Sequence, residues 1–119
     1  LGARSVLGLE IDSVSVGVSK QNLRENKVGA NVRIAQGSLP HPDARPNSYD
    51  VAVANISAKV VSDVAGELVR AVKPGGAIIG SGILLDNRSW VEQAIVSAGG
   101  RIEHTFVDGE WVTIEASVP

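Results

Sequence analysis

Two acidic residues follow a short aliphatic run near the start of the chain. Glu10 and Asp12 lie at the end of Ser5–Ile11, a segment typical of a buried strand. In open α/β sheets ligands bind at the carboxyl ends of strands, where a carboxylate can accept hydrogen bonds from both ribose hydroxyls. We assign Glu10 to such a ribose and Asp12 to the N-cap of the next helix. Folds that bind nicotinamide and flavin cofactors share this acidic signal.

A third polar residue, Asn55, follows an apolar strand and precedes a helix. Its carboxamide offers an acceptor and a donor, so it could orient an attacking amine or contact an amino-acid carboxylate. It could equally cap the helix, a role for which Ser57 competes, and the residues alone leave both interpretations open. Ser38, just after another predicted strand, could hydrogen-bond an adenine edge or lie in a plain turn.

The two histidines, His41 and His104, are far apart and have no ligand spacing between them. Because Zn²⁺ needs three or four convergent ligands, the sequence predicts no metal site. His104 alternates with apolar residues and is expected to face solvent. The chain also contains no nucleophile elbow, no Walker-type loop and no Gly-x-Gly-x-x-Gly motif.

The segments that would position these residues alternate between strand and helix patterns. The predicted helices are Ser13–Lys27, Ser57–Val72 and 86–98. The predicted strands are Ser5–Ile11, Asn31–Gln36, Tyr49–Ala54, Ala77–Leu84, and a final pair at Arg101–Val107 and Glu110–Ala116. This order favours parallel strands with right-handed crossovers, followed by one antiparallel strand.

Residues that cap or break helices and favour turns set the boundaries of these elements. We expect Gly29 to end the first helix, the run Lys73–Gly76 to end the second, and Asp86 to cap the third. Asp108–Gly109 between alternating runs is a strong hairpin signal.

Helical spacing also predicts which side chains face inward. Val14 and Val18 should do so on the first helix and Trp90 on the third.

Composition limits the class of protein. The chain has 119 residues, of which 44% are hydrophobic, 20% charged and 3% aromatic, as in one soluble domain with an aliphatic core. A net charge of −2 indicates no direct nucleic-acid binding. The absence of cysteine is compatible with the cytoplasm, and no apolar run is long enough to span a membrane. Because the chain opens with Leu1 in what resembles a helix end, we expect further sequence upstream.

Several motifs together resemble one family. They are Val-Leu-Gly-Leu-Glu-Ile-Asp at 6–12, Asn22 and Asn26, Tyr-Asp-Val-Ala-Val-Ala-Asn-Ile at 49–56, Val-Lys-Pro-Gly-Gly at 72–76, Ser-Gly-Ile-Leu at 81–84 and Gly-Glu-Trp-Val at 109–112. In this order and spacing they are similar to the ribosomal large-subunit protein eleven methyltransferases, and they cover nearly the whole chain. Lys-Pro-Gly-Gly is common to class I methyltransferases, whereas the Ala-Asn-Ile, Ser-Gly-Ile-Leu and Gly-Glu-Trp-Val set is more specific.

The resemblance implies a Rossmann-like class I methyltransferase fold, a three-layer α/β sandwich. Its mixed sheet has the strand order 3-2-1-4-5-7-6 and a C-terminal antiparallel hairpin. Residues 1–119 would be a partial S-adenosylmethionine-dependent domain that supplies strands 2 to 7 and lacks strand 1 and the glycine-rich loop.

The resemblance also implies roles for single residues. Glu10, Ile11, Ser38 and Asn55 would bind S-adenosylmethionine, and Asn55 would also be catalytic. The methyl acceptor would be lysine or α-amino groups of a ribosomal protein.

Two other functions compete with this one. The chain could be a non-catalytic fragment that binds a partner or self-associates through unpaired sheet edges, since an uncovered strand edge is open to pairing. A dinucleotide-binding oxidoreductase domain is disfavoured by the terminal hairpin and by Lys-Pro-Gly-Gly.

Overall fold

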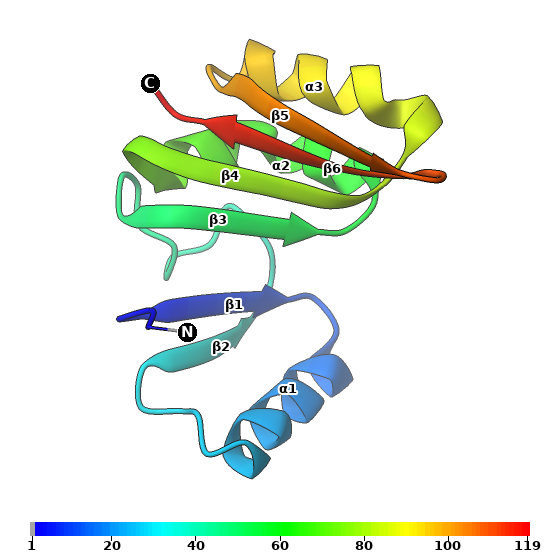
Figure 1. Cartoon of the computed structure of the whole chain (residues 1–119). Coiled ribbons are helices and arrows are strands. Elements are labelled where there is room, and N and C mark those ends of the chain that lie inside the picture. Colours follow the sequence, from blue (N-terminus) through cyan, green and yellow to red (C-terminus); the bar gives the residue numbers. More distant parts are fainter. Residues whose placement is uncertain (1) are drawn as a thin grey trace. The chain divides into compact units, whose positions relative to one another are not determined.

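The computed structural model of the chain describes residues 2–119 and divides into two compact units, 1–44 and 45–119 (Figure 1). The helices are α1 (Ser13–Glu25), α2 (Ala58–Ala71) and α3 (Arg88–Ser97), and a 3-10 turn, η1 (Leu85–Asn87), precedes α3. The strands are β1 (Val6–Glu10), β2 (Val32–Gln36), β3 (Tyr49–Asn55), β4 (Val72–Leu84), β5 (Arg101–Asp108) and β6 (Trp111–Ser117). No helix among the described residues has the length and apolar character needed to cross a membrane.

The first unit is a β1–α1–β2 crossover. The two strands are parallel, and their register runs from Val6 opposite Val32 to Glu10 opposite Gln36. At the centre of this pair Gly8 faces Ile34, where an added Cβ would lie 2.7 Å from the Ile34 Cδ1 atom. Glycine therefore leaves room for the end of the Ile34 side chain beside β1.

The second unit is a four-stranded sheet in the order β3-β4-β6-β5, with β3 parallel to β4 and β6 antiparallel to both of its neighbours. Helices α2 and α3 contact each other and lie on one face of this sheet (Figure 1). The core between them is aliphatic, and its fully buried side chains are Val61, Val72, Ile78, Ile83, Val91, Ile95, Val112 and Ile114. Small branched side chains suit the close contact of helix and sheet.

The predicted fold class, a mixed α/β sandwich with a C-terminal antiparallel hairpin, is confirmed. In the family's numbering, which counts one further strand before β1, strands β1 to β6 are strands 2 to 7. The first unit then has the order 3-2 and the second the order 4-5-7-6, as the resemblance implies. Among the described residues β1 and β3 each have a strand partner on one side only.

Some predicted boundaries were wrong. Helix α1 ends at the C-cap Asn26, and Lys27 rather than Gly29 takes the left-handed conformation, with φ of 56°. The amides of Lys27 and Val28 donate to the carbonyls of Arg24 and Leu23, the two hydrogen bonds of a Schellman motif. Lysine occupies the usual glycine position there.

Helix α3 does not begin with a capping aspartate. Asp86 lies inside η1, and the N-cap residue Asn87 makes no side-chain capping bond. The hairpin is confirmed, but its register pairs Asp108 with Trp111, so the two-residue turn is Gly109–Glu110. Gly109 has φ of 60° and Glu110 does not have a positive φ, as in a type II′ turn.

Strand β4 begins earlier than predicted. The run Lys73–Gly76 ends α2 as expected, but Val72 already pairs with Tyr49, and the register shifts before Ala77 pairs with Val51. A positive φ of 85° at Gly75 accompanies this irregular stretch.

Three side chains predicted to face inward are exposed. Val14 and Val18 are 72% and 51% exposed, and Val16 between them is the buried residue of α1. A two-stranded sheet covers only a narrow stripe of the helix, and residues two apart lie on nearly opposite sides of it. Trp90 is 48% exposed because Val91 and Ile95, one turn apart, form the inward stripe of α3.

Candidate functional site

Glu10 ends β1, at the carboxyl edge of the first sheet. One carboxylate oxygen accepts the amide of Asp12 at 3.2 Å, and the backbone carbonyl accepts the amide of Gly37 at 2.8 Å. The other carboxylate oxygen has no partner among the described residues. Glu10 is half-buried, so this free acceptor is fixed at a strand end but accessible to a hydroxyl group.

Asp12 caps α1, as predicted. Its carboxylate accepts the hydroxyl of Ser15 at 2.9 Å and the amide of Val14 at 3.2 Å. These two hydrogen bonds, that from Ser15 first, lower the pKa of the Asp12 carboxyl below its usual value. The Asp12 side chain is thus occupied in capping α1, whereas Glu10 keeps a free carboxylate oxygen.

Ile11 and Ser38 lie at the same edge of the first unit. Ile11 follows β1, is 70% exposed, and accepts a hydrogen bond from the Gln36 side chain at 3.3 Å. Ser38 is exposed and follows Gly37, whose amide binds the end of β1. The structure therefore brings Glu10, Ile11 and Ser38 to one edge.

The loop after β2 is held by His41. Its Nε2 lies 3.0 Å from the carbonyl of Gln36, and its Nδ1 accepts the amide of Asp43 at 3.0 Å. His104 is exposed, as predicted, and its Nδ1 lies 3.5 Å from a carboxylate oxygen of Glu115. The described residues include no group of three or more potential ligands for a metal ion.

Asn55 ends β3, in the second unit, and does not cap α2. Ser57 is the N-cap, with its hydroxyl oxygen 3.4 Å from the amide of Val60. The Asn55 Oδ1 atom instead accepts a hydrogen bond of 2.9 Å from the hydroxyl of Ser81 on β4. The carboxamide is exposed at the carboxyl end of its strand, where open α/β sheets bind their ligands.

Ser81 and Gly82 form a support for Asn55 that the sequence analysis did not assign. Gly82 has φ of 74°, and a Cβ there would lie 2.7 Å from the carbonyl oxygen of Ile56 and 3.2 Å from Oδ1 of Asn55. Only glycine fits this position, because the backbone is left-handed and the space is filled. The signal available in the sequence was the Ser-Gly-Ile-Leu motif at 81–84, to which no role was given.

Comparison with known proteins decides the family. A family model described as ribosomal protein L11 methyltransferase (PrmA) matches residues 1–118. The chain belongs to the ribosomal protein L11 methyltransferase family. Curated relatives with that name include those of Listeria innocua serovar 6a, 36% identical over 114 residues, and Exiguobacterium sp., 40% identical over 116 residues. These matches take in 96% and 98% of this chain but 36% of each relative, so it spans about a third of the L11 methyltransferase length.

One solved structure of the same family superimposes closely on this chain. The ribosomal protein L11 methylase of Lactobacillus delbrueckii subsp. bulgaricus superimposes with a TM-score of 0.90 at 26% identity, over 98% of this chain and 59% of that one. A SAM-dependent methyltransferase from Aquifex aeolicus gives a TM-score of 0.79 at 14% identity, over 97% of this chain and 69% of that one. The second likeness is one of fold alone.

Proposed function

We propose that this chain is part of an S-adenosylmethionine-dependent methyltransferase that methylates lysine or α-amino groups of ribosomal protein L11. The observation that carries the proposal is the family match over residues 1–118. The chain would form a partial domain and act together with the remaining length that its relatives possess. Because ribosomes are cytoplasmic, we place the reaction in the cytoplasm.

The residues of the first unit suit the nucleoside part of the cofactor. The free carboxylate oxygen of Glu10 is an acceptor for a ribose hydroxyl, and the exposed Ile11 offers an apolar contact. The Ser38 hydroxyl can donate to or accept from an adenine edge. S-adenosylmethionine, when bound, supplies an electrophilic methyl group on a sulfonium centre.

Asn55 would position the methyl acceptor. Its Oδ1 atom has a second lone pair beside the one engaged by Ser81, so it can accept an N–H of the substrate amine. The amine must be neutral to react, and a free lysine has a pKa of about 10.4, which desolvation lowers. Among the described residues no carboxylate or imidazole hydrogen-bonds to Asn55, so its contribution would be alignment rather than proton abstraction.

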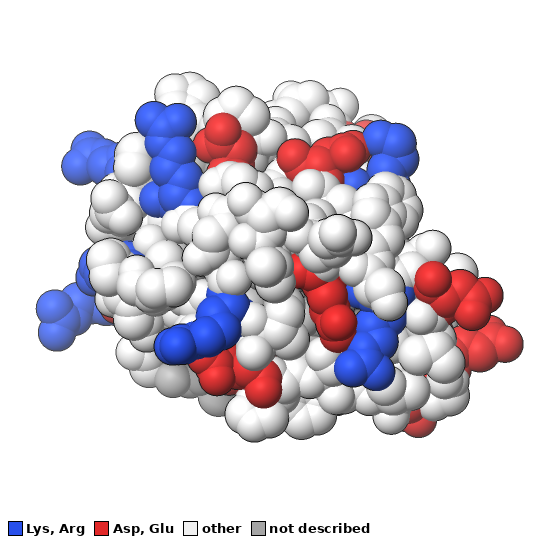
Figure 2. Space-filling model, turned by 90° about the horizontal axis from the view of Figure 1, so that it is seen from above, with Lys and Arg blue, Asp and Glu red and all other residues white. Residues whose placement is uncertain are grey.

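The mixed charge on one face of the molecule suits a protein substrate better than direct nucleic-acid binding. On the face seen in Figure 2, basic and acidic side chains are interspersed rather than gathered by sign. Nucleic-acid binding domains instead present a clustered basic face.

A second candidate function is self-association through sheet edges. Within the part of the chain that the structure describes, β3 is an edge strand of its sheet, and its Val51 and Val53 side chains are 51% and 65% exposed. An apolar edge strand is a template for pairing with another chain. Sedimentation that detects a stable dimer of the purified chain, lost in Val53→Lys, would favour this function.

Methyl transfer to purified ribosomal protein L11 tests the main proposal. A chimera in which residues 1–119 replace the matching segment of the Listeria innocua relative provides the missing length. We expect it to transfer radiolabelled methyl groups from S-adenosylmethionine to L11. A folded chimera that binds S-adenosylmethionine but labels no L11 would contradict the proposal.

A further inference from the structure

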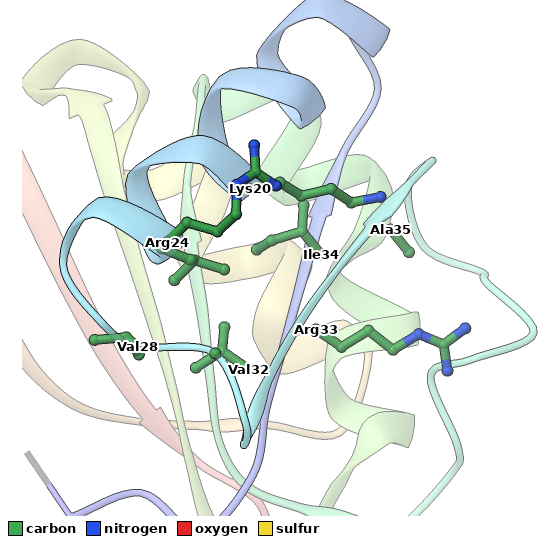
Figure 3. A pocket seen from close by; sticks show the side chains of 9 residues that line it. Lys20, Arg24, Val28, Val32, Arg33, Ile34 and Ala35 are labelled. Atoms are coloured by element: carbon green, nitrogen blue, oxygen red, sulfur yellow. The ribbon is translucent and has the colours of Figure 1, made fainter.

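An open groove of about 460 Å³ lies between the C-terminal half of α1 and strand β2. Figure 3 shows side chains of α1 reaching over it from one side and side chains of β2 bordering it from the other. Its principal lining residues are Lys20, Leu23, Arg24, Val28, Val32 and Ile34. The groove lies entirely within the first unit.

Two cations on α1 give the groove its charge. Lys20 and Arg24 are four residues apart, and neither takes part in an ion pair among the described residues. Like charges at this spacing face each other on a helix and destabilise it slightly. The third cation, Arg33, differs, because it is paired with Asp43 at 2.8 Å and points away from the helix in Figure 3.

The floor of the groove is apolar. Leu23 and Val28 occupy the two positions of the Schellman motif at the end of α1 between which a hydrophobic contact is frequent. Val28 nevertheless remains 42% exposed, and Val32 and Ile34 on β2 are half-buried. The Schellman motif therefore accounts for the apolar residues at the end of α1. It does not cover the apolar floor, which stays exposed beneath Lys20 and Arg24.

Strand β2 borders the groove and has β1 as its partner on one side only among the described residues. Its other edge is open to an extended peptide, which binds by main-chain hydrogen bonds and places alternate side chains on one face. Four residues of helix rise about 6 Å. Two residues of strand rise about 6.6 Å. Carboxylates at alternate positions of an added strand thus match the spacing of Lys20 and Arg24.

We infer that this groove binds an extended acidic segment of another protein, with carboxylates at alternate positions on the α1 side. The residues between them face the other side of the sheet and are β-branched, which favours the extended conformation. The segment adds a strand to β2, and its carboxylates pair with Lys20 and Arg24. Single-stranded nucleic acid fits the groove less well, because none of the lining residues is aromatic and the floor offers nothing to phosphates.

Fluorescence anisotropy with a labelled heptapeptide of alternating valine and glutamate tests this inference. We expect binding that weakens with salt, and an at least tenfold higher Kd for the same peptide with glutamine in place of glutamate. This comparison uses the unaltered protein, so it does not depend on the folding of a variant. Equal affinity for the two peptides would overturn the inference.

Variants locate the binding site. Lys20→Gln/Arg24→Gln should raise the Kd at least tenfold. Lys59→Gln/Arg70→Gln on α2 should leave it unchanged, and Arg70 is a matched control because, like Arg24, it lies in the last turn of its helix. Amide exchange should slow at 32–36 when the peptide binds. Slowing at 49–55 instead, or displacement of the peptide by equimolar single-stranded RNA, would contradict the inference.

Discussion

The hydroxyl of Ser81 lies 2.9 Å from Oδ1 of Asn55, and the two residues occupy paired positions on the parallel strands β3 and β4. Because this hydrogen bond engages the oxygen of the carboxamide, it sets which side of the amide group donates and which accepts. A Cβ at Gly82 would lie 3.2 Å from the same oxygen, so glycine leaves room for the carboxamide. A substrate amine would therefore meet a side chain with one fixed orientation.

Loss of the Ser81 hydroxyl should slow methyl transfer without weakening cofactor binding. In the chimera, Ser81→Ala should lower kcat by about 2- to 13-fold, the equivalent of one neutral hydrogen bond of about 0.5–1.5 kcal/mol. The KM for S-adenosylmethionine should stay within about twofold. Steady-state methylation of L11 measures both values.

Ser81→Thr is the matched control, because it keeps the hydroxyl. It should recover most of the rate that Ser81→Ala loses. If the alanine and threonine variants turn over equally, the contact with Asn55 has no part in positioning the amine.

Glu10 should contribute to cofactor binding, whereas Asp12 should contribute to the stability of the fold. Glu10→Ala in the chimera should weaken S-adenosylmethionine binding by about 1–3 kcal/mol, the usual result of losing a hydrogen bond to a charged group. Asp12→Ala removes a helix N-cap and should instead lower the free energy of unfolding. Isothermal titration calorimetry and urea unfolding distinguish the two, and unchanged cofactor affinity in Glu10→Ala would remove that residue from the site.

The 119-residue chain by itself should bind S-adenosylmethionine very weakly. It contains no Gly-x-Gly-x-x-Gly turn through which the backbone could approach a ligand, and Ile11 and Ser38 lie on an exposed edge. Ordering such a surface opposes binding. Titration calorimetry should give a Kd of roughly 1 mM or weaker, which is at most about 4 kcal/mol of binding free energy. Micromolar binding by a monomer would refute this expectation.

Glu92 should make the stability of the second unit depend on pH. Its carboxylate accepts hydrogen bonds from Arg88 at 2.9 Å and Thr105 at 2.8 Å, and the bond from Arg88 above all lowers its pKa below 4.5. A lowered pKa in the folded state means that the ionised carboxylate stabilises the fold above about pH 4.5. This stabilisation is lost as the pH falls through the folded-state pKa.

Urea unfolding of Glu92→Gln tests this dependence. At pH 7 the variant should be less stable than the unaltered chain by about 0.5–1.5 kcal/mol. The difference should shrink as the pH falls from 7 through the lowered pKa of Glu92, because the protonated carboxyl is neutral like the glutamine. Glu110→Gln, at an exposed turn, is the control and should change little. A difference for Glu92→Gln that stays constant across this range would contradict the assignment.

Local signals in the sequence predicted the elements and some of their caps. Asp12 was assigned correctly because an N-cap depends on residues within three positions of it. Asn55 stayed ambiguous because the residue that fixes its role, Ser81, is 26 positions away and is brought opposite by strand pairing. Its contact could be foreseen only from the register of β3 and β4.

The wrong predictions concern features that depend on residues far away in the sequence. The exposed Val14 and Trp90 satisfy a helical pattern, but which stripe of a helix is covered depends on the strands beneath it. The hairpin turn lies at Gly109–Glu110, one residue later than predicted, because the register between β5 and β6 pairs Asp108 with Trp111. A dipeptide signal locates a turn but does not set its register.

Asn55→Ala in the chimera tests most directly the claim that this chain carries the methyl-transfer residue. The measurement is the rate of methyl transfer to ribosomal protein L11, made beside the thermal midpoint of the same preparation. We predict a rate at least about tenfold lower, since misaligned reactants lose the advantage of proximity, with a nearly unchanged thermal midpoint. A variant that melts early but methylates L11 at the normal rate would contradict this account and leave Asn55 a purely structural residue.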